Sequence, residues 1–370
     1  MHDAMPREAV ETVIIGGGQA GLAMAYELQR QGRSSVILEA HGRVGESWRQ
    51  RWDSLSLFTP ARLSHLPGMK QPRPDWAFAT KDEFADYLEA YAEHFGFDVR
   101  YHARTERISR RGDRYLVDAG DERLVAEQVV LATGAYQEPK VPVFATDLSA
   151  EVRQMHSSAY RSQRQLEPGA VLVVGAGNSG AEIALELAAS HAVYLSGTAP
   201  VFPVRPTSPA ARIVMPMFLF AATRLLNTST PMGRRMRPQA QNHAAPLIRT
   251  KPADLRRAGV ERVARIAGVA DGLPVTEDGR RLDVANVIWC TGYRSDFSWI
   301  DLPAFAGVEE PAHDRGVVRD EPGVYLIGQR FQYALASSFI GGVGRDARFI
   351  AKQIARRVEQ REAAPVATVA

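Results

Sequence analysis

An apolar run leads directly into a glycine-rich turn near the start of the chain, at Val10-Glu11-Thr12-Val13-Ile14-Ile15-Gly16-Gly17-Gly18-Gln19-Ala20-Gly21. The β-branched residues are typical of a buried strand, and the helical spacing of Leu22, Ala25 and Leu28 predicts a helix after the turn. Gly32 ends this helix, and a second strand at residues 35–38 stops at Glu39. The order strand, turn, helix, strand predicts a doubly wound α/β unit.

The same order of elements returns in the middle of the chain. Residues 170–174, Ala-Val-Leu-Val-Val, lead into the second turn, Gly175-Ala176-Gly177-Asn178-Ser179-Gly180, and a helical pattern follows it. The run Val193-Tyr194-Leu195 then has the character of the next strand. Two such units on one chain predict two Rossmann-like α/β domains.

Each unit is expected to gain closing strands later in the chain. Residues 128–132 precede Thr133-Gly134, residues 287–290 precede Thr291-Gly292, and residues 324–327 precede Gly328. The simplest interpretation inserts the second domain into the first. The first domain then comprises residues 1–160 plus 296–370, and the second comprises residues 165–295.

The spacing of the glycines predicts dinucleotide binding, because each turn lies between a strand and a helix. Gly16 permits the tight turn, Gly18 lets backbone amides approach a pyrophosphate, and Gly21 allows close packing of helix on strand. The unpaired N–H groups of the helix N-terminus, at Gln19 and Ala20, favour phosphate. By the same argument the second site comprises Gly175, Gly177, Asn178, Ser179 and Gly180.

The residues at the end of the second strand of each unit predict which nucleotide each turn accepts. Glu39 places a carboxylate where it accepts hydrogen bonds from a ribose diol and repels a 2′-phosphate, which favours FAD or NAD. In the second unit the strand ends at Ser196, Gly197 and Thr198, with no acid and no immediate arginine. Ser196, Thr198 or Arg205 could serve there instead, so we expect weak discrimination between NADH and NADPH.

Composition excludes several other classes of protein. The 370 residues are 45% hydrophobic and 24% charged, with a formal net charge of +3, which is ordinary for a globular enzyme. Cys290 is the only cysteine, so neither an intrachain disulfide nor a CxxC redox pair exists. No HExxH or CxxC grouping indicates a metal, and no GxSxG elbow indicates a serine hydrolase.

The chain ends and the basic middle segment give weaker indications. The N-terminus has no apolar signal region and no stretch reaches the roughly 20 apolar residues of a membrane span, so we expect a cytoplasmic protein. Between residues 206 and 250 arginines are frequent, but no nucleic-acid recognition motif accompanies them. The apolar run at residues 213–220 could line a substrate entrance, form a subunit contact or pack in the core. We take a homodimer as the default oligomeric state.

Several motifs together resemble class B flavin-containing monooxygenases, especially short bacterial members. The similarity covers residues 10 to 356 approximately and is weakest between Pro206 and Thr250. Besides the two turns and Glu39, the matching stretches are Gly45-Glu46-Ser47-Trp48-Arg49, His156-Ser157-Ser158-Ala159-Tyr160, Cys290-Thr291-Gly292-Tyr293-Arg294, Gly323-Val324-Tyr325-Leu326-Ile327-Gly328 and Gly341-Gly342-Val343-Gly344-Arg345.

The resemblance implies FAD and NADPH or NADH as cofactors, with a small-molecule substrate and dioxygen as partners. In such enzymes the nicotinamide reduces the flavin, which reacts with dioxygen to form a C4a-(hydro)peroxyflavin. That species oxygenates a sulfide or an amine, or a ketone in Baeyer–Villiger chemistry. The resemblance also implies that Trp48 and Arg49 flank the flavin and that Gln329 touches flavin or substrate, while His156 is read as a hydrogen-bonded structural residue.

One departure from the family pattern predicts leakage of oxidant. Many members carry an asparagine near the flavin, which helps protect the peroxyflavin, whereas residues 55–60 contain none and place Phe58 or Thr59 in that neighbourhood. We therefore expect partial uncoupling to hydrogen peroxide. The alternatives are an NAD(P)H-dependent flavin oxidoreductase or oxidase without oxygen insertion, and a nucleotide-sensing protein without turnover.

Overall fold

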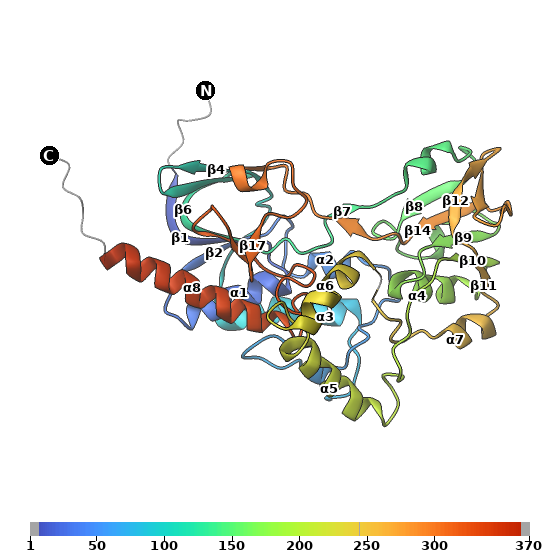
Figure 1. Cartoon of the computed structure of the whole chain (residues 1–370), viewed down its shortest axis with the longest axis horizontal. Helices are drawn as coiled ribbons and strands as arrows, with labels where there is room; N and C mark the ends of the chain where they lie inside the picture. The colour runs from blue at the N-terminus through green and yellow to red at the C-terminus, as the bar shows by residue number, and fades with distance from the viewer. Residues whose placement is uncertain (1–6, 244, 364–370) are drawn as a thin grey trace.

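The computed structural model describes residues 7–243 and 245–363, in which two sheets with parallel cores stand side by side (Figure 1). The first sheet runs in the order β16 (Ile300–Asp301), β4 (Thr105–Arg111), β5 (Arg114–Ala119), β6 (Glu122–Leu131), β1 (Glu8–Ile15), β2 (Ser35–Leu38) and β3 (Asp98–Arg100). A branch from β6 adds β19 (Val324–Leu326), β18 (Val317–Val318) and β17 (His313–Asp314).

The centre of the first sheet is built from four parallel strands whose carboxyl ends are in register. Ile15 of β1 pairs with Leu38 of β2 and with Leu131 of β6, and Leu131 in turn pairs with Leu326 of β19. The residues that follow these strands therefore emerge at one edge of the sheet. This is the edge at which parallel α/β sheets bind ligands.

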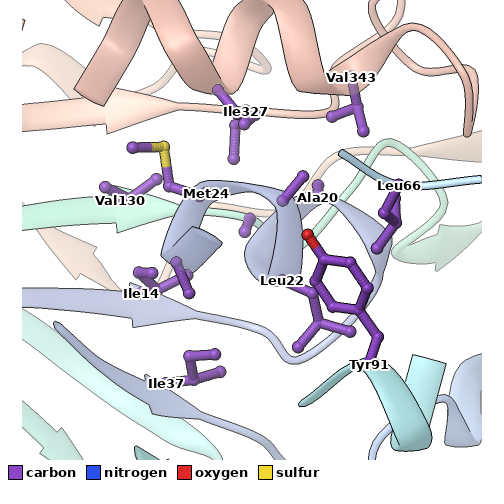
Figure 2. Close-up of a cluster of buried hydrophobic side chains, with 14 of the residues drawn as sticks. Ile14, Ala20, Leu22, Met24, Ile37, Leu66, Tyr91, Val130, Ile327 and Val343 are labelled. Atoms are coloured by element: carbon purple, nitrogen blue, oxygen red, sulfur yellow. The ribbon is translucent and has the colours of Figure 1, made fainter. Parts of the chain in front are cut away.

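Two helices cover this sheet with apolar side chains. Helix α1 (Gln19–Gln29) and helix α8 (Val343–Ala363) pack together over one face of the sheet. Figure 2 shows Met24 of α1 beside Val130 of β6, with Ile14 of β1 below the helix and Ile327, which follows β19, above it in this view. These side chains are all buried, and burial of each contributes roughly 1.5–3 kcal/mol.

The second sheet is parallel throughout. Its order is β11 (Glu261–Val263), β10 (Val193–Ser196), β9 (Val171–Val174), β14 (Asn286–Trp289) and β8 (Arg153–His156). Helices α4 (Asn178–Leu187) and α7 (Pro252–Arg257) pack against each other beside this sheet. The four residues of β9 are buried on both faces, which explains their continuous apolar run.

The second unit is inserted into the first, as the sequence predicted. All strands of the second sheet lie in the chain between β6 and β16. Where the chain leaves and returns, β7 (Glu138–Pro139) pairs antiparallel with β15 (Tyr293–Arg294). The domain boundaries given above stay predictions, and β8, whose residues precede the predicted boundary, pairs with β14 of the second sheet.

The remaining elements connect or flank the two sheets. They are α2 (Glu46–Arg49), α3 (Lys81–Phe95), α5 (Ala211–Arg224), α6 (Pro231–Asn242), the hairpin β12 (Ile266–Ala270) and β13 (Leu273–Thr276), and the 3-10 turns Ala61–Leu63, Val143–Asp147, Gln163–Gln165 and Pro303–Phe305. A capping box between Thr80 and Glu83 begins α3, and Gly96 in the left-handed region ends it. Across residues 7–243 and 245–363, no helix combines the length and the apolar character that crossing a bilayer requires.

Candidate functional site

The first glycine turn has the shape that a diphosphate cradle needs. Gly16 has a φ of 107°, and a Cβ added there would lie 2.9 Å from the carbonyl oxygen of Ala132. A Cβ on Gly21 would overlap the carbonyl oxygen of Gly16. By contrast, a Cβ on Gly18 would meet nothing within 4 Å, so this side of the turn is open. The amides at the start of α1, at Gln19 and Ala20, are therefore accessible to a phosphate.

Glu39 is held rigidly at the edge of the first sheet. Its side chain accepts hydrogen bonds from the backbone N–H of Gly17 at 2.9 Å and from that of His41 at 2.9 Å. Glu39 is 8% exposed. A carboxylate offers about four acceptor positions, so capacity remains for a ribose hydroxyl.

The structure separates Trp48 from Arg49. The indole N–H of Trp48 donates to Oε1 of Gln19 at 3.1 Å, which brings the ring to the first turn. The guanidinium of Arg49 instead donates to Asp86 at 2.6 Å and to Glu89 at 2.8 Å, both on α3. Its charge is therefore already neutralised by two carboxylates, and its predicted contact with the flavin stays a prediction.

Two more segments, the turns after β19 and after β6, reach the same edge of the first sheet. A Cβ on Gly328 would lie 2.9 Å from the Cβ of Ala20, so the turn after β19 touches the start of α1. Gln329 is buried, and its side-chain amide donates to the carbonyl oxygen of Gly134 at 3.2 Å. Gln137 donates to the hydroxyl of Thr133 at 2.6 Å. The structure thus brings these predicted residues together with the first turn.

Phe58 and Thr59 follow a buried segment beside α3. Phe58 is exposed, whereas the hydroxyl of Thr59 is hydrogen bonded to that of Ser64, which is fully buried. The hydroxyl of Thr59 is therefore directed at Ser64. A role of either residue at the flavin stays a prediction.

The second glycine turn repeats the geometry of the first. Gly175 has a φ of 106°, and a Cβ there would overlap the carbonyl oxygen of Cys290. A Cβ on Gly180 would overlap the carbonyl oxygen of Gly175. The side chain of Cys290 packs against Gly175 and Gly180. Burial raises the pKa of its thiol to about 12, so the thiol stays protonated and unreactive at neutral pH.

Asn178 and Ser196 make internal contacts. The side-chain amide of Asn178 donates to the carbonyl oxygen of Pro246 at 2.9 Å, and its oxygen accepts from the N–H of Ile248 at 3.0 Å. The hydroxyl of Ser196 donates to the carbonyl oxygen of Ala264 at 2.9 Å. Asn178 therefore fixes the segment that returns from α6, and the hydroxyl of Ser196 is directed toward β11.

The end of β10 carries a cation that sequence reasoning missed. Arg262 of β11 is exposed and donates to the carbonyl oxygen of Gly197, next to the exposed Thr198. No carboxylate of residues 7–243 or 245–363 forms an ion pair with it. Arg205, in contrast, forms a bidentate pair with Asp254 at 2.9 and 2.8 Å. No sequence signal identified Arg262, because its position depends on the pairing of β10 with β11.

The turn after β14 is tied to the crossing between the two units. The hydroxyl of Thr291 donates to the carbonyl oxygen of Lys140, and the N–H of Lys140 donates to that of Gly292 at 2.9 Å. His156 contacts the carbonyl oxygen of Gly292 through Nε2 at 3.0 Å, and its Nδ1 accepts from the N–H of Ser158 at 3.1 Å. Burial lowers the pKa of His156, which favours the neutral imidazole that these bonds require.

The buried carboxyl group of Glu182 on α4 is connected, through Arg249, to the segment that precedes Phe58. Glu182 of α4 is buried, and the guanidinium of Arg249 lies 3.6 Å from its Oε1. Burial raises the pKa of Glu182 to about 7, while the charge of Arg249 opposes the rise. Arg249 also donates to the carbonyl oxygen of Ser56 at 3.3 Å. Glu182 was not predicted, because this contact joins segments far apart in the sequence.

The chain is similar to known proteins over most of its length. The pyridine nucleotide-disulphide oxidoreductase family matches residues 13–213. An uncharacterized CzcO-like oxidoreductase of Geobacillus kaustophilus is 37% identical over 351 residues, which cover 93% of this chain and 98% of that protein. A probable indole-3-pyruvate monooxygenase of Arabidopsis thaliana, YUCCA7, is 29% identical over 97% of this chain and 90% of its own length.

A solved structure extends the comparison to three dimensions. The flavin-containing monooxygenase from Stenotrophomonas maltophilia superposes with a TM-score of 0.78 and 28% sequence identity. The superposition covers 95% of this chain and 99% of that one. The two chains therefore share one fold over nearly their whole length.

Proposed function

Because the chain belongs to the pyridine nucleotide-disulphide oxidoreductase family and is a flavin-dependent NAD(P)H monooxygenase of the class B type, we propose that it oxygenates a small organic molecule. The substrate class is a sulfide or an amine, or a ketone that undergoes Baeyer–Villiger oxidation. The observation that carries the proposal is the pair of glycine turns, of which only the first is followed by a buried ribose-type carboxylate, Glu39. This asymmetry supports FAD at the first turn and the nicotinamide nucleotide at the second.

FAD would be held at the edge of the first sheet. The open side of Gly18 and the amides of Gln19 and Ala20 bind the diphosphate, and Glu39 accepts from the adenosine ribose. The N–H of Trp48 fixes Gln19, and Gln329 fixes the turn at Gly134. When bound, FAD supplies hydride acceptance and the activation of dioxygen.

The nicotinamide cofactor would lie on the second turn, with weak discrimination between NADH and NADPH. Three features support this proposal. Residues 196–198 at the end of β10 include no carboxylate that would repel a 2′-phosphate, Arg205 is neutralised by Asp254, and Arg262 is an exposed cation. One charged hydrogen bond contributes roughly 1.5–3 kcal/mol, which corresponds to a preference for NADPH of roughly 10- to 150-fold, below the several hundredfold of a strict preference.

We also propose partial uncoupling. Residues 55–60 contain no asparagine, so this segment lacks the side-chain amide that protects the reactive flavin in related enzymes. The hydroxyl of Thr59 does not replace that amide, because it is hydrogen bonded to Ser64. Consumption of NAD(P)H should therefore exceed the formation of product. The same observation favours the second candidate function, an NAD(P)H oxidase that passes electrons to dioxygen without inserting oxygen.

Labelled dioxygen separates the two candidates. The purified enzyme is supplied with NADPH and oxygen-18 gas, together with thioethers, tertiary amines and cyclic ketones, and products are identified by mass spectrometry. The monooxygenase places one labelled oxygen atom in an organic product and the other in water. If every substrate is recovered unlabelled while hydrogen peroxide accounts for all the NADPH consumed, the oxidase is correct.

The oligomeric state and location complete the proposal. We propose a homodimer, the commonest oligomer among soluble proteins, and a cytoplasmic location. Light scattering on the purified protein measures the first of these properties.

A further inference from the structure

One face of α5 is apolar and uncovered. Ile213, Met217 and Phe220 follow each other at spacings of four and three residues, so they lie on one side of the helix. They are 67%, 65% and 60% exposed, whereas Ala211, Met215 and Ala222 are buried on the other side. Figure 1 shows α5 at the lower edge of the molecule, below both sheets in this view.

The apolar surface continues on both sides of this helix. Leu225 at the end of α5 and Met232 at the start of α6 are also largely exposed. On the other side, Met217 borders an open groove of about 410 Å³. The groove is lined by apolar side chains from α5 and from the segments around it, namely Val201, Phe202, Pro203, Val214, Met217, Phe218 and Pro246. We call the surface formed by Ile213, Met217, Phe220, Leu225 and Met232 the α5 face.

The segment of sequence that contains the α5 face carries positive charges and no negative ones. Residues 187–253 contain no aspartate or glutamate but eight cationic residues, whereas the rest of the chain has fewer basic than acidic residues. Some of these cations are paired, as Arg205 is with Asp254 and Arg237 is with Glu310. Among the described residues no carboxylate forms an ion pair with the four cations nearest the α5 face in sequence, Arg212, Arg224, Arg234 and Arg235.

We propose that the α5 face docks on an anionic lipid bilayer. An apolar helix face with arginines at its ends matches the interface of such a membrane, where apolar side chains reach the boundary of the acyl chains and arginines meet lipid phosphates. The groove beside Met217 offers space for an acyl chain. The five apolar side chains of the α5 face and the four arginines together supply attraction of both kinds, since each cation near an anionic surface adds roughly 1 kcal/mol.

The charge distribution favours a lipid surface over a second copy of this chain. In a twofold contact between two α5 faces, Arg212 and Arg224 of one copy would meet the same cations of the other. Like charges at the rim of an apolar contact oppose association. An anionic bilayer has the complementary charge and the complementary apolar layer.

Vesicle sedimentation tests the proposal on the full-length, FAD-loaded protein. Vesicles of phosphatidylcholine with phosphatidylglycerol are compared with vesicles of phosphatidylcholine alone. The protein should sediment with the anionic vesicles, and added salt should weaken this binding. In the double variant Ile213→Ser/Phe220→Ser the partition coefficient should fall at least about tenfold, because two apolar side chains no longer insert.

Two further variants separate the contributions of charge and of apolar area. Arg224→Gln/Arg234→Gln/Arg235→Gln should lose the preference for anionic lipid. Val143→Ser/Val308→Ser, which alters exposed apolar residues far from α5 in the sequence, should bind like the unaltered protein. Bleaching of the flavin by NADPH without vesicles should be unchanged in all three, which shows that each is folded.

Several outcomes would overturn the proposal. These are absence of binding to anionic vesicles, equal binding to both vesicle types, or equal binding of Ile213→Ser/Phe220→Ser. A dimer that dissociates in this double variant would show that a second copy covers the α5 face. Retention by an acidic protein or a nucleic acid without lipid binding would also overturn it.

Discussion

At the scale of single residues, the two glycine turns differ in the side chain that stands beyond the following strand. Glu39 accepts from two backbone amides at the first turn, whereas Arg262 reaches the end of β10 at the second. The first group repels a 2′-phosphate and the second attracts one. We therefore propose that the nucleotide preference of each site depends on one side chain.

Replacement of Arg262 tests this reading of the second site. In Arg262→Gln the KM for NADPH should rise roughly tenfold, since one charged hydrogen bond to the 2′-phosphate is lost, while the KM for NADH stays unchanged. Steady-state kinetics with both nucleotides measures the change. Arg265→Gln removes an exposed arginine three residues away and should alter neither constant. A matched rise in both KM values would contradict a role at the 2′-position.

Glu182 should make stability depend on pH. Its pKa is raised in the folded protein from 4.5 to about 7, so its contribution to stability is complete below pH 4.5 and is lost as pH rises through 7. Relative to Glu182→Gln, the free energy of unfolding of the unaltered protein should fall by on the order of 2–3 kcal/mol between pH 5 and 8. Denaturant unfolding at both pH values measures this difference, and a pH-independent difference would refute it.

At the scale of elements, the strand–turn–helix unit could be predicted from sequence because its signals are local. The second strand was predicted at residues 35–38 and is observed there, and the first was predicted at 10–15 and spans 8–15. A run of β-branched residues indicates a strand that is buried on both faces of its sheet. A glycine between strand and helix indicates a position where a side chain would not fit. These signals need no knowledge of distant segments.

Other features could not be predicted because they depend on contacts between distant segments. Arg262 reaches Gly197 only because β11 pairs with β10, and Glu182 meets Arg249 only after α6 returns to α4. Pairing order and helix packing are absent from a single sequence. For the same reason, the sequence could not decide whether residues 213–220 line a substrate entrance, form a subunit contact or pack in the core. The structure shows that one face of this helix is exposed.

The tight packing of α4 on the second turn gives a prediction at this scale. Gly180→Ala places a Cβ against the carbonyl oxygen of Gly175 and 3.3 Å from the Cβ of Cys290. Such overpacking should lower the free energy of unfolding by roughly 1–3 kcal/mol and raise the KM for both nicotinamide nucleotides. Gly268→Ala, whose added Cβ meets nothing within 4 Å, should do neither. Thermal unfolding and steady-state kinetics together check the pair, and equal behaviour of the two variants would count against the packing argument.

At the scale of the whole molecule, the two sheet edges that carry the glycine turns are connected by a pair of crossing strands and by packing of Trp52 and Leu55 against the second unit. The paired strands β7 and β15 carry the chain out of the first sheet and back, and the turn at Thr291 and Gly292 is bonded to this crossing at Lys140. The first sheet is completed only when the chain returns at β16. Both turns are thus parts of one continuous structure, which a hydride transfer between their ligands requires.

We propose that FAD lies at the first turn and that the nucleotide at the second turn delivers the hydride that reduces it. The most direct measurement is the flavin absorbance of the purified, FAD-reconstituted protein when NADPH is added without oxygen. The account predicts a yellow protein with about one FAD per chain, which loses its colour on addition of NADPH and regains it in air. A protein that takes up no FAD, or whose bound FAD keeps its colour in excess NADPH and NADH, would contradict the account.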